Sequence, residues 1–572
     1  MLNSETVEPN PSTIQPENVS VAAKVGWTVL ILATLYVCYF SHLGAIGFVG
    51  PDEPRYAWIA RDMVETGDWV TPRLYGKPWF EKPVLYYWGA ALSFKLFGVS
   101  EAAARLPSAI SALLATLALA WLALRLYGAE TARWLLLLLP TTVGMIGFSH
   151  AAATDMPFSA MLTIAMVCAA VALRLVPASL YATPSDVGAG LAPPAAATPR
   201  SFLDALPALI LFGFFLGLAV LAKGPAALIL CGGAIFFWAL FTKRWRDAFR
   251  LFHPAALAAF CLTALPWYIL CARRNPDFFR IFILEHNFKR YLTPEFQHIQ
   301  PFWYYGPILF IALYPWIGMT FSAVICFFRE EVGMRMDAIS IFALGWGVFP
   351  LLFFSTSKSK LPGYILPAIP AFVLLTAFAM ASGLKAKRVR VPAGFAVIAL
   401  TPVAAIGAIS LAVLSIDYPG GLDLYGRLGG FLSFLALTTI LLLASRKMHQ
   451  ATVLSGVLAW ICFVVLTNRV AMPRLDPRVS ARSVAQKVLD ASDILRNVET
   501  LRLRRDLEYG LNFYLHRQLP EWDATETSQH YVISSLEGTL ELREKGIPFH
   551  VLSGTSVDAI FLKVGGSVSG AR

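Results

Sequence analysis

Long apolar runs recur along the chain and limit its fold more than any other feature. Each run has 17 to 27 residues, the length that an α-helix needs to cross the hydrocarbon core of a bilayer. With 57% hydrophobic and only 15% charged residues, the composition excludes a soluble multidomain enzyme. The sequence therefore predicts an all-α polytopic membrane protein with about 13 transmembrane helices. The runs lie at 26–47, 103–125, 133–149, 156–176, 203–222, 225–242, 255–271, 302–328, 337–354, 362–383, 391–414, 428–445 and 451–470.

One further run, 83–99, begins at a proline, contains Lys95 and has the minimum length for a span. If it does not cross, the short loops on one side hold fourteen Lys or Arg residues and those on the other side hold four. The positive-inside rule then makes the first side cytoplasmic, although two long basic outer segments nearly remove the bias when every loop is counted. Thirteen crossings predict a cytoplasmic tail at 1–25, a periplasmic loop at 48–102 with 83–99 as an interfacial helix, and a periplasmic C-terminus.

The remaining segments are assigned from their composition. Residues 1–23 contain no Lys or Arg and no small-residue cleavage site follows the first run, so 26–47 is interpreted as a retained span. Pro, Ala, Gly and Ser dominate 177–201, which predicts a flexible cytoplasmic linker within a membrane domain at 26–470. Short alternating stretches predict a periplasmic α/β domain at 471–572, with helices near 480–493 and 509–518 and strands near 498–503, 531–534, 548–552 and 559–564.

Charge and cysteine usage exclude other classes. The net charge is +11, but the basic residues lie between the apolar runs, which indicates topology and anionic lipid rather than nucleic acid. All seven cysteines lie in or beside apolar runs without a Cys-x-x-Cys pair, so the sequence predicts neither a thiolate metal site nor a disulfide framework.

Charged residues at span ends are candidates for function because a charge at membrane depth is costly unless it faces protein or water. The first group is Asp52 with Arg55 and Tyr56, directly after the first span. Alternatively, Asp52 caps an interfacial helix and Pro54 occupies its first turn.

The second group is Lys82 between Glu81 and Pro83, followed by Tyr86. An interfacial aromatic belt accounts for the tyrosine but not for the rigidly held ammonium, which suits a phosphate at headgroup level. The third is Asp155 at the start of a span, either as a helix cap or as a carboxylate that shares a face with Asp52. Two carboxylates there could hold a cationic group or a metal.

The fourth group lies in the loop 273–300, where basic and aromatic residues, including Arg290, suit an anionic headgroup. Glu285 and His286 could bind a divalent ion, but adjacent residues on a helix point about 100° apart, so this signal is weak. The fifth comprises Lys358, Lys360 and Tyr364, which otherwise read as snorkelling anchors. Lys223 before Gly224-Pro225 is a smaller case of the same kind.

Together these motifs resemble the membrane-embedded GT-C glycosyltransferases of the undecaprenyl phosphate-aminoarabinose:lipid A transferase type, which are related to the protein O-mannosyltransferases. The resemblance covers nearly all of 26–470. It rests on AspGluProArgTyrAla at 52–57, GluLysProValLeuTyrTyrTrp at 81–88, ThrAspMetPro at 154–157, GluHisAsnPheLysArgTyr at 285–291 and SerLysSerLysLeuProGlyTyrIleLeuPro at 357–367. Many relatives have Lys-Pro-Pro where this chain has Lys82-Pro83-Val84, which leaves the lysine in place.

The resemblance implies transfer of 4-amino-4-deoxy-L-arabinose from undecaprenyl phosphate to a lipid A phosphate at the periplasmic face of the inner membrane, with inversion and with polymyxin resistance as the outcome. It implies a monomer that requires no cofactor, with a divalent metal left open. The expected site residues are Asp52 and Asp155 as catalytic, Arg55, Tyr56, Lys82, Tyr86, Arg290, Lys358, Lys360 and Tyr364 as substrate-binding, and Glu81, Glu285 and His286 as candidate ligands if a metal binds.

Two other functions remain open from the sequence. One is a transferase of the same fold with another polyprenyl-phosphate sugar, such as mannose transferred to protein hydroxyls. The other is a lipid flippase, which the sequence disfavours because transporters commonly carry internal repeats and none is evident here.

Overall fold

The computed structural model describes residues 20–175, 205–292, 299–328, 337–385, 449–490, 498–523, 529–554 and 558–565. The expected tail up to residue 19, the linker at 177–201 and the spans at 391–414 and 428–445 lie outside these residues. The statements below concern the described part of the chain.

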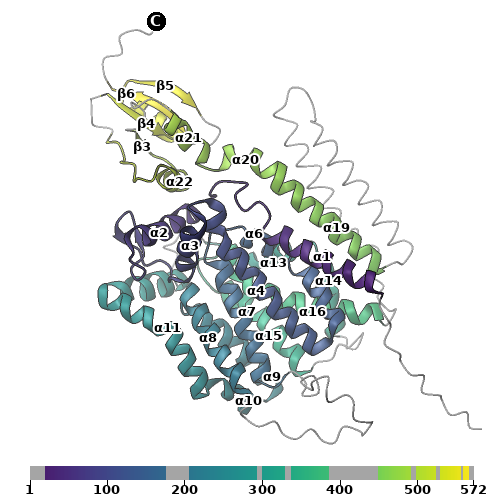
Figure 1. The fold of residues 1–572 in the computed structure, drawn as a ribbon. Coiled ribbons are helices and arrows are strands. Elements are labelled where there is room, and N and C mark those ends of the chain that lie inside the picture. The colour runs from purple at the N-terminus through teal and green to yellow at the C-terminus, as the bar shows by residue number, and fades with distance from the viewer. Residues whose placement is uncertain are drawn as a thin grey trace, which may run out of the picture.

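A bundle of apolar helices makes up most of the molecule (Figure 1). In the described residues, eight helices are long and apolar enough to cross a membrane, or ten if each of two bent pairs counts as one span. The prediction of an all-α polytopic membrane protein is thereby confirmed. The long helices are α1 (Val21–Tyr39), α4 (Glu101–Tyr127), α7 (Asp155–Ala172), α8 (Leu206–Lys223), α11 (Pro254–Arg274), α15 (Ala338–Ser355), α16 (Ile369–Lys385, preceded by the 3₁₀ turn η7, Pro362–Ala368) and α19 (His449–Leu466).

The centre of the bundle is α7, in which 89% of the apolar window is buried and which packs against α4 and α8. By contrast, α1 exposes Val25, Val29, Leu32 and Tyr36 along one stripe. Their spacing of three and four residues places them on one helix face, which is the face that lipid would cover. Shorter elements complete the bundle: α9 (Ala226–Thr242), α10 (Trp245–Phe249), η4 (Arg250–Phe252), the π-helix η5 (Arg280–Lys289), α12 (Arg290–Leu292) and η6 (Phe302–Tyr304).

Two of the expected spans are each divided into two helices with a bend between them. The run 133–149 forms α5 (Ala129–Leu138) and α6 (Val143–Ser149), which meet at 61°. The run 302–328 forms α13 (Tyr305–Leu313) and α14 (Ile317–Phe328), and the bend there is 112°. Pro140 and Pro315 lie at these breaks, and proline lacks the amide hydrogen that a continuous helix requires.

The segment after α1 forms a small layer on one end of the bundle. It contains α2 (Asp52–Thr66), a hairpin of β1 (Arg73–Leu74) and β2 (Lys77–Pro78), and α3 (Leu85–Phe97). With 13 residues α3 is about 20 Å long, which is too short to cross a bilayer. It packs against α2 and α4 through buried Tyr86, Tyr87, Ala90 and Phe94.

Beyond this layer lies a small unit that we call the C-terminal module, defined as the described residues from 472 to 565 (Figure 1). Its helices are α20 (Met472–Val479), α21 (Arg482–Asp490), α22 (Arg505–Leu515) and α23 (Leu536–Glu544). Its strands are β3 (Glu499–Leu501), β4 (His530–Ser534), β5 (Phe549–Gly554) and β6 (Ile560–Val564), in the order β3-β4-β6-β5. The β3–β4 pair is parallel and the others are antiparallel. The helix α19 runs beside α1 and leads into this module through the short π-helix η8 (Thr467–Ala471).

Candidate functional site

A cavity of about 360 Å³ brings together segments that are far apart in the sequence. Its wall is mostly apolar, with contributions from the loop before α3, the α8–α9 junction, η5 with α12, and the turn between α15 and η7. The polar residues that line it are Glu81, Lys82, Lys223, His286, Tyr291, Ser357, Ser359 and Tyr364. A mostly apolar cavity with a few convergent polar groups is the usual form of a small-molecule site.

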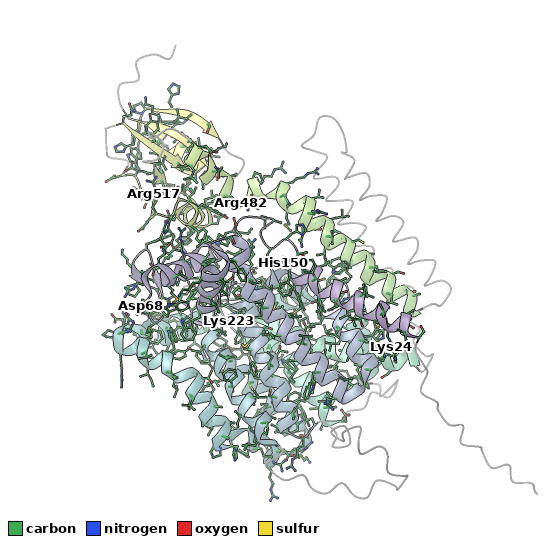
Figure 2. All side chains as sticks on the ribbon, viewed as in Figure 1. Lys24, Asp68, His150, Lys223, Arg482 and Arg517 are labelled. Atoms are coloured by element: carbon green, nitrogen blue, oxygen red, sulfur yellow. The ribbon has the colours of Figure 1, made fainter. Side chains whose placement is uncertain are left out.

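The Asp155–Lys223 ion pair joins two helix ends at this cavity. Asp155 is the first residue of α7 and Lys223 the last residue of α8, so each charge lies where the helix dipole favours it. The Lys223 Nζ is 2.5 Å from the Asp155 Oδ1, and it lies 4.7 Å from the centre of the Tyr364 ring. Figure 2 shows Lys223 toward the end of the bundle that carries α2 and α3. Because Asp155 pairs with Lys223 and Thr154 precedes the helix, the interpretation of Asp155 as only a helix cap is wrong.

The glycine at 363 is required by the position of this carboxylate. A Cβ atom on Gly363 would meet the Asp155 Oδ1 and the Phe148 ring. The Pro-Gly-Tyr arrangement after Lys360 therefore lets the start of η7 approach the start of α7 and places Tyr364 over Lys223.

A second group of charges, which we call the Asp52 cluster, consists of Asp52, Arg55 and Glu81. Asp52 begins α2, and its Oδ1 accepts a hydrogen bond from the Arg55 Nη2. The same Nη2 is 3.1 Å from the Glu81 Oε2. The Arg55 and Glu81 side chains are 12% exposed, whereas that of Asp52 is 51% exposed. Because Pro51 is the N-cap of α2, Asp52 is not the cap, and its carboxylate is open to a ligand.

The Arg55 guanidinium is held by aromatic rings as well as by carboxylates. Its Cζ lies 5.3 Å from the Trp79 ring centre and 5.4 Å from that of Tyr56. Burial alone would lower the pKa of Arg55, but the charges of Glu81 and Asp52 outweigh it and raise the pKa. Glu81 also lines the cavity, so it connects the Asp52 cluster to the space beside Lys82 and Lys223.

Glu53, the second carboxylate of the pair at 52–53, has buried partners that the sequence did not indicate. Its carboxylate accepts hydrogen bonds from Arg105 at 2.7 and 2.9 Å and from the backbone amides of Val49 and Ala152, both at 2.7 Å. Arg105 is 2% exposed and also donates to the carbonyls of Leu43, Ile46 and Gly47. The buried hydrogen bonds of Glu53 and Arg105 thus hold the loop before α2 and the loop before α7. These loops in turn position Asp52 and Asp155.

The other expected basic residues have different surroundings. Lys82 lines the cavity, and its predicted contact with an anion stays a prediction. Lys360 is buried and donates to the carbonyls of Gln300 at 3.0 Å and Ser357 at 2.5 Å, so it does not snorkel as an anchor. Burial and the neighbouring Lys358 lower the pKa of Lys360, while Lys358 itself is exposed. The Arg290 backbone begins α12 beside the cavity, and its side chain lies outside the described residues.

Two tyrosines that the sequence predicted as substrate-binding are buried in the protein interior. Tyr86 is fully buried and its hydroxyl donates to the Ala104 carbonyl at 2.9 Å, which fastens α3 to α4. Tyr56 is buried against Tyr86 and Tyr87, with its ring beside Arg55.

The three expected metal ligands do not form a common site in the described residues. Glu285 pairs with Arg280 at 2.6 Å, and Glu81 pairs with Arg55. His286 lines the cavity with Glu81, but the described part of the chain contains no group of three His, Cys, Asp or Glu side chains that could hold a metal ion.

Two family models match the chain, both described as dolichyl-phosphate-mannose-protein mannosyltransferase. They cover residues 81–183 and 196–282. These ranges contain the second and third groups of charged residues and most of the helices around α7.

Two arabinosyl transferases are among the proteins to which this chain is similar. The undecaprenyl phosphate-alpha-4-amino-4-deoxy-L-arabinose arabinosyl transferase of Edwardsiella ictaluri is 34% identical over 354 residues, which are 62% of this chain and 59% of that protein. A second such transferase, from Sodalis glossinidius, is 33% identical over 367 residues, which are 64% of this chain and 62% of that protein. The alignments thus span about three fifths of the length of each relative.

A solved structure covers almost the whole chain. The crystal structure of ArnT from Cupriavidus metallidurans bound to undecaprenyl phosphate superposes with a TM-score of 0.73 at 22% identity, over 96% of this chain and 100% of that one. The expected resemblance to the aminoarabinose transferases is thus confirmed, and this chain is a polytopic membrane protein with their GT-C fold.

Proposed function

We propose that this protein transfers 4-amino-4-deoxy-L-arabinose from undecaprenyl phosphate to a phosphate of lipid A, with inversion at the anomeric carbon. The observation that carries the proposal is the cavity lined by Lys82, Lys223 and Glu81. Asp155 pairs with Lys223 at its edge, and Glu81 joins it to the Asp52 cluster. The names of the relatives support the sugar and the carrier. Modification of lipid A phosphate with a cationic sugar would give resistance to polymyxin and other cationic peptides.

The cavity chemistry suits a lipid-linked sugar phosphate. An apolar wall can accept the start of a prenyl chain, and ammonium groups stabilise the charge that grows on a departing phosphate. Tyr56 and Tyr86 are buried and do not line the cavity, so we assign to them support of the site rather than contact with the sugar. We assign stabilisation of the phosphate charge to Lys82, with Arg290, Arg55 and Lys358 as further cations, and contact with the sugar to Tyr364. Lys360 is expected to hold the turn that leads to Tyr364, because its ammonium donates to two carbonyls.

The reaction exchanges one phosphate ester for another. A lipid A phosphate oxygen forms a bond to the anomeric carbon while the bond from that carbon to the carrier phosphate breaks, and its electron pair leaves with undecaprenyl phosphate. Attack from the face opposite the leaving group inverts the centre. The anomeric carbon gains positive charge in the transition state, which the Asp52 carboxylate would stabilise, with Asp155 as a second negative group.

The acceptor determines what Asp52 has to do. A lipid A phosphate is ionised at neutral pH, so its attack requires no proton transfer, whereas a Ser or Thr hydroxyl would require a general base. Asp52 is therefore assigned to positioning and charge stabilisation. The amino group of the sugar also carries a positive charge, for which a carboxylate is the natural partner. No metal ion is part of the proposal.

The same proposal places the site at the periplasmic face of the inner membrane. We infer thirteen spans, a cytoplasmic N-terminus and a periplasmic C-terminus, with the membrane domain at 26–470 and a periplasmic α/β domain at 471–572. The position of α2, α3 and the C-terminal module on one end of the bundle supports this division (Figure 1). The protein is proposed to act as a monomer on its carrier and acceptor lipids.

A second candidate function is transfer of mannose from a polyprenyl phosphate to a protein hydroxyl. The two family models, which carry the mannosyltransferase description, favour it. The half-exposed Asp52 carboxylate could serve as the base that a hydroxyl acceptor needs.

Purified full-length protein, offered each donor with each acceptor, separates the two functions. We expect lipid A to gain the mass of one aminopentose when undecaprenyl phosphate-linked aminoarabinose is present. Mannose on a Ser- or Thr-containing peptide, with no change in lipid A, would support the second candidate instead. Intact donors and acceptors in all four mixtures, with folded protein, would contradict both.

A further inference from the structure

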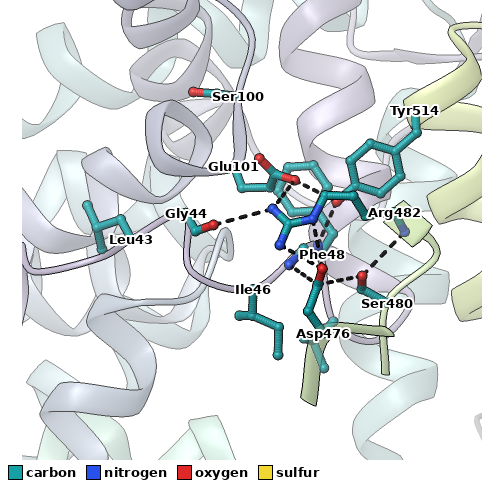
Figure 3. Close-up of polar contacts among 12 residues, drawn as sticks. Leu43, Gly44, Ile46, Phe48, Ser100, Glu101, Asp476, Ser480, Arg482 and Tyr514 are labelled. Carbon is teal, nitrogen blue, oxygen red and sulfur yellow. Dashed lines mark hydrogen bonds and ion pairs between the residues drawn. The ribbon is translucent and has the colours of Figure 1, made fainter. Parts of the chain in front are cut away.

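The C-terminal module is fastened to the loop before α2 by buried polar contacts (Figure 3). The Asp476 Oδ1 accepts from the Gly47 amide at 2.6 Å, and the Asp476 Oδ2 accepts from Arg482 at 2.7 Å. Arg482 also donates to Glu101 at 3.2 Å. The Tyr514 hydroxyl donates to Glu101 and accepts from the Phe48 amide, each at 2.9 Å. Contacts with two backbone amides of one loop define a single docked position.

With the C-terminal module in this position, α22 packs against α2. On α22, Tyr509 and Phe513 are four residues apart and therefore share one face, which His516, the C-cap residue that follows the helix, extends. Each meets a side chain or ring from α2: the Arg61 Cζ lies 6.0 Å from the Phe513 ring centre, and the His516 ring centre lies 5.9 Å from that of Trp58. The Asn512 side chain donates to the Tyr75 hydroxyl at 3.0 Å from the same side.

The third residue of this face, Tyr509, reaches the Asp52 cluster. Its ring centre lies 5.6 Å from the Arg55 Cζ, which is within the range of a cation–π contact. Trp79 and Tyr56 contact the same guanidinium from the segment that carries Arg55, whereas Tyr509 comes from the C-terminal module. One Arg55 nitrogen, Nη2, meets both Asp52 and Glu81, so a small rotation of the guanidinium would change its distance to each carboxylate.

We infer that Tyr509 is a positioning residue for Arg55 and that the C-terminal module thereby completes the Asp52 cluster. The inference rests on the proposed function in so far as Asp52 takes part in transfer. The ring face of Tyr509 limits the rotation of the guanidinium, and Arg55 in turn orients the Asp52 carboxylate. The hydroxyl of Tyr509 has no part in this role.

The test compares Tyr509→Leu with Tyr509→Phe in the full-length protein. A cation–π contact of this kind corresponds to a change of about three- to tenfold in an equilibrium or rate. We expect Tyr509→Leu to lower kcat by about that factor, with KM for the lipid-linked donor unchanged, and Tyr509→Phe to retain kcat. Tyr531→Leu is the matched control, because Tyr531 lies on β4 and is partly buried against the core of the module itself. It should alter thermal stability without selectively lowering kcat.

A second measurement does not depend on which sugar is transferred. Phenylglyoxal modifies exposed guanidinium groups, and peptide mass spectrometry follows the reaction at Arg55. Tyr509→Leu should raise the rate at Arg55 and Tyr509→Phe should not. A wild-type protein that transfers no sugar would contradict the proposed function, and the modification rate would still decide the role of Tyr509.

Three outcomes would overturn the inference. Wild-type kcat and wild-type modification of Arg55 in Tyr509→Leu would show that the ring does not position the guanidinium. An equal loss in Tyr509→Phe would assign the effect to the hydroxyl. An equal fall of kcat in Tyr531→Leu would assign it to the general stability of the module.

Discussion

Two neighbouring carboxylates, Asp52 and Glu53, have opposite surroundings in this protein. Glu53 is buried, and its two oxygens accept from Arg105 and from two backbone amides. Asp52 is half exposed and shares Arg55 with Glu81. A carboxylate whose oxygens are all used inside the protein can organise the fold, whereas one with an open side can meet a substrate. Of these two adjacent residues, Glu53 therefore has a structural role, whereas Asp52 is available to a substrate.

The difference also explains why the two regions depend on each other. Arg105, through Glu53 and three carbonyls, fixes the loop before α2, and the C-terminal module holds the same loop from the other side. Asp52 starts its helix at the end of this fixed loop. The exposed carboxylate therefore has a defined position although few contacts are made to its own side chain.

The largest effect is expected from Glu53→Gln. This substitution leaves the Arg105 charge buried without its carboxylate, which typically costs about 3–5 kcal/mol of folding stability. We expect a large loss of folded protein and a lower Tm in detergent, measured by thermal unfolding of the purified protein. Asp52→Asn is the matched control and should keep the wild-type Tm. Equal stability of wild type and Glu53→Gln would show that the buried pair does not organise the loop.

Asp52→Asn should act on turnover instead. Removal of a group that stabilises transition-state charge lowers the rate by roughly 100- to 1000-fold. We expect such a fall in transfer, with the affinity for undecaprenyl phosphate within about twofold of wild type, because the cavity cations remain. Single-turnover transfer and carrier binding, measured on the same preparation, check this prediction. Near-normal turnover would remove Asp52 from the mechanism.

Lys82→Ala should weaken carrier binding by about tenfold, since a hydrogen bond to a charged group contributes roughly 1.5 kcal/mol or more. The affinity for undecaprenyl phosphate, measured by titration in detergent, is the readout. Lys77, which is exposed on β2 in the same loop, provides the control. A loss in Lys77→Ala equal to that in Lys82→Ala would indicate general electrostatic attraction rather than a phosphate contact at Lys82.

The smallest effect concerns pH and the contact between α2 and α22. Burial alone would raise the pKa of Glu65, but hydrogen bonds from Arg61 and His516 lower it below its ordinary value. A carboxyl group with a lowered pKa stabilises the docked state above its ordinary pKa, and this contribution is lost as the pH falls through the lowered pKa. Because both side chains of the Glu65–His516 pair are almost half exposed, the contribution is about 1 kcal/mol or less.

Hydrogen exchange of α22 at several pH values measures this effect. The wild type should lose protection of α22 as the pH falls below the ordinary pKa of a glutamate, whereas Glu65→Gln should show the weaker protection at neutral pH as well. An unchanged protection pattern in Glu65→Gln at neutral pH would show that the pair does not hold the module. Such a result would indicate that the contacts of Asp476 and Arg482 hold the C-terminal module in place.

The membrane class and the approximate gathering of the site could be predicted from the sequence. Apolar length identified most spans, because the bilayer imposes one length on every crossing helix. Charge at membrane depth is costly, and this criterion identified Lys82, Asp155 and the segment of Lys358, Lys360 and Tyr364. In the structure, these segments line or adjoin one cavity. The breaks at Pro140 and Pro315 were predictable in principle, since both residues lie inside apolar runs that were treated as continuous.

Other parts depend on tertiary packing that no local pattern records. The partner of Asp155 is Lys223 on another helix, and only the packing of α7 on α8 brings them together. No local pattern distinguishes Asp52 from Glu53 in the sequence. They differ because Arg105, on α4, pairs with Glu53 in the folded protein. The helix α23 was not expected, because two of its leucines, Leu536 and Leu540, face outward and leave a weak apolar pattern.

The most direct test of the account is the mass of lipid A from cells that produce either the wild-type protein or Asp52→Asn at equal membrane levels. We expect one added aminopentose on phosphate with the wild type and unmodified lipid A with the variant. The same added mass in both strains, or in neither while both proteins are folded, would contradict it.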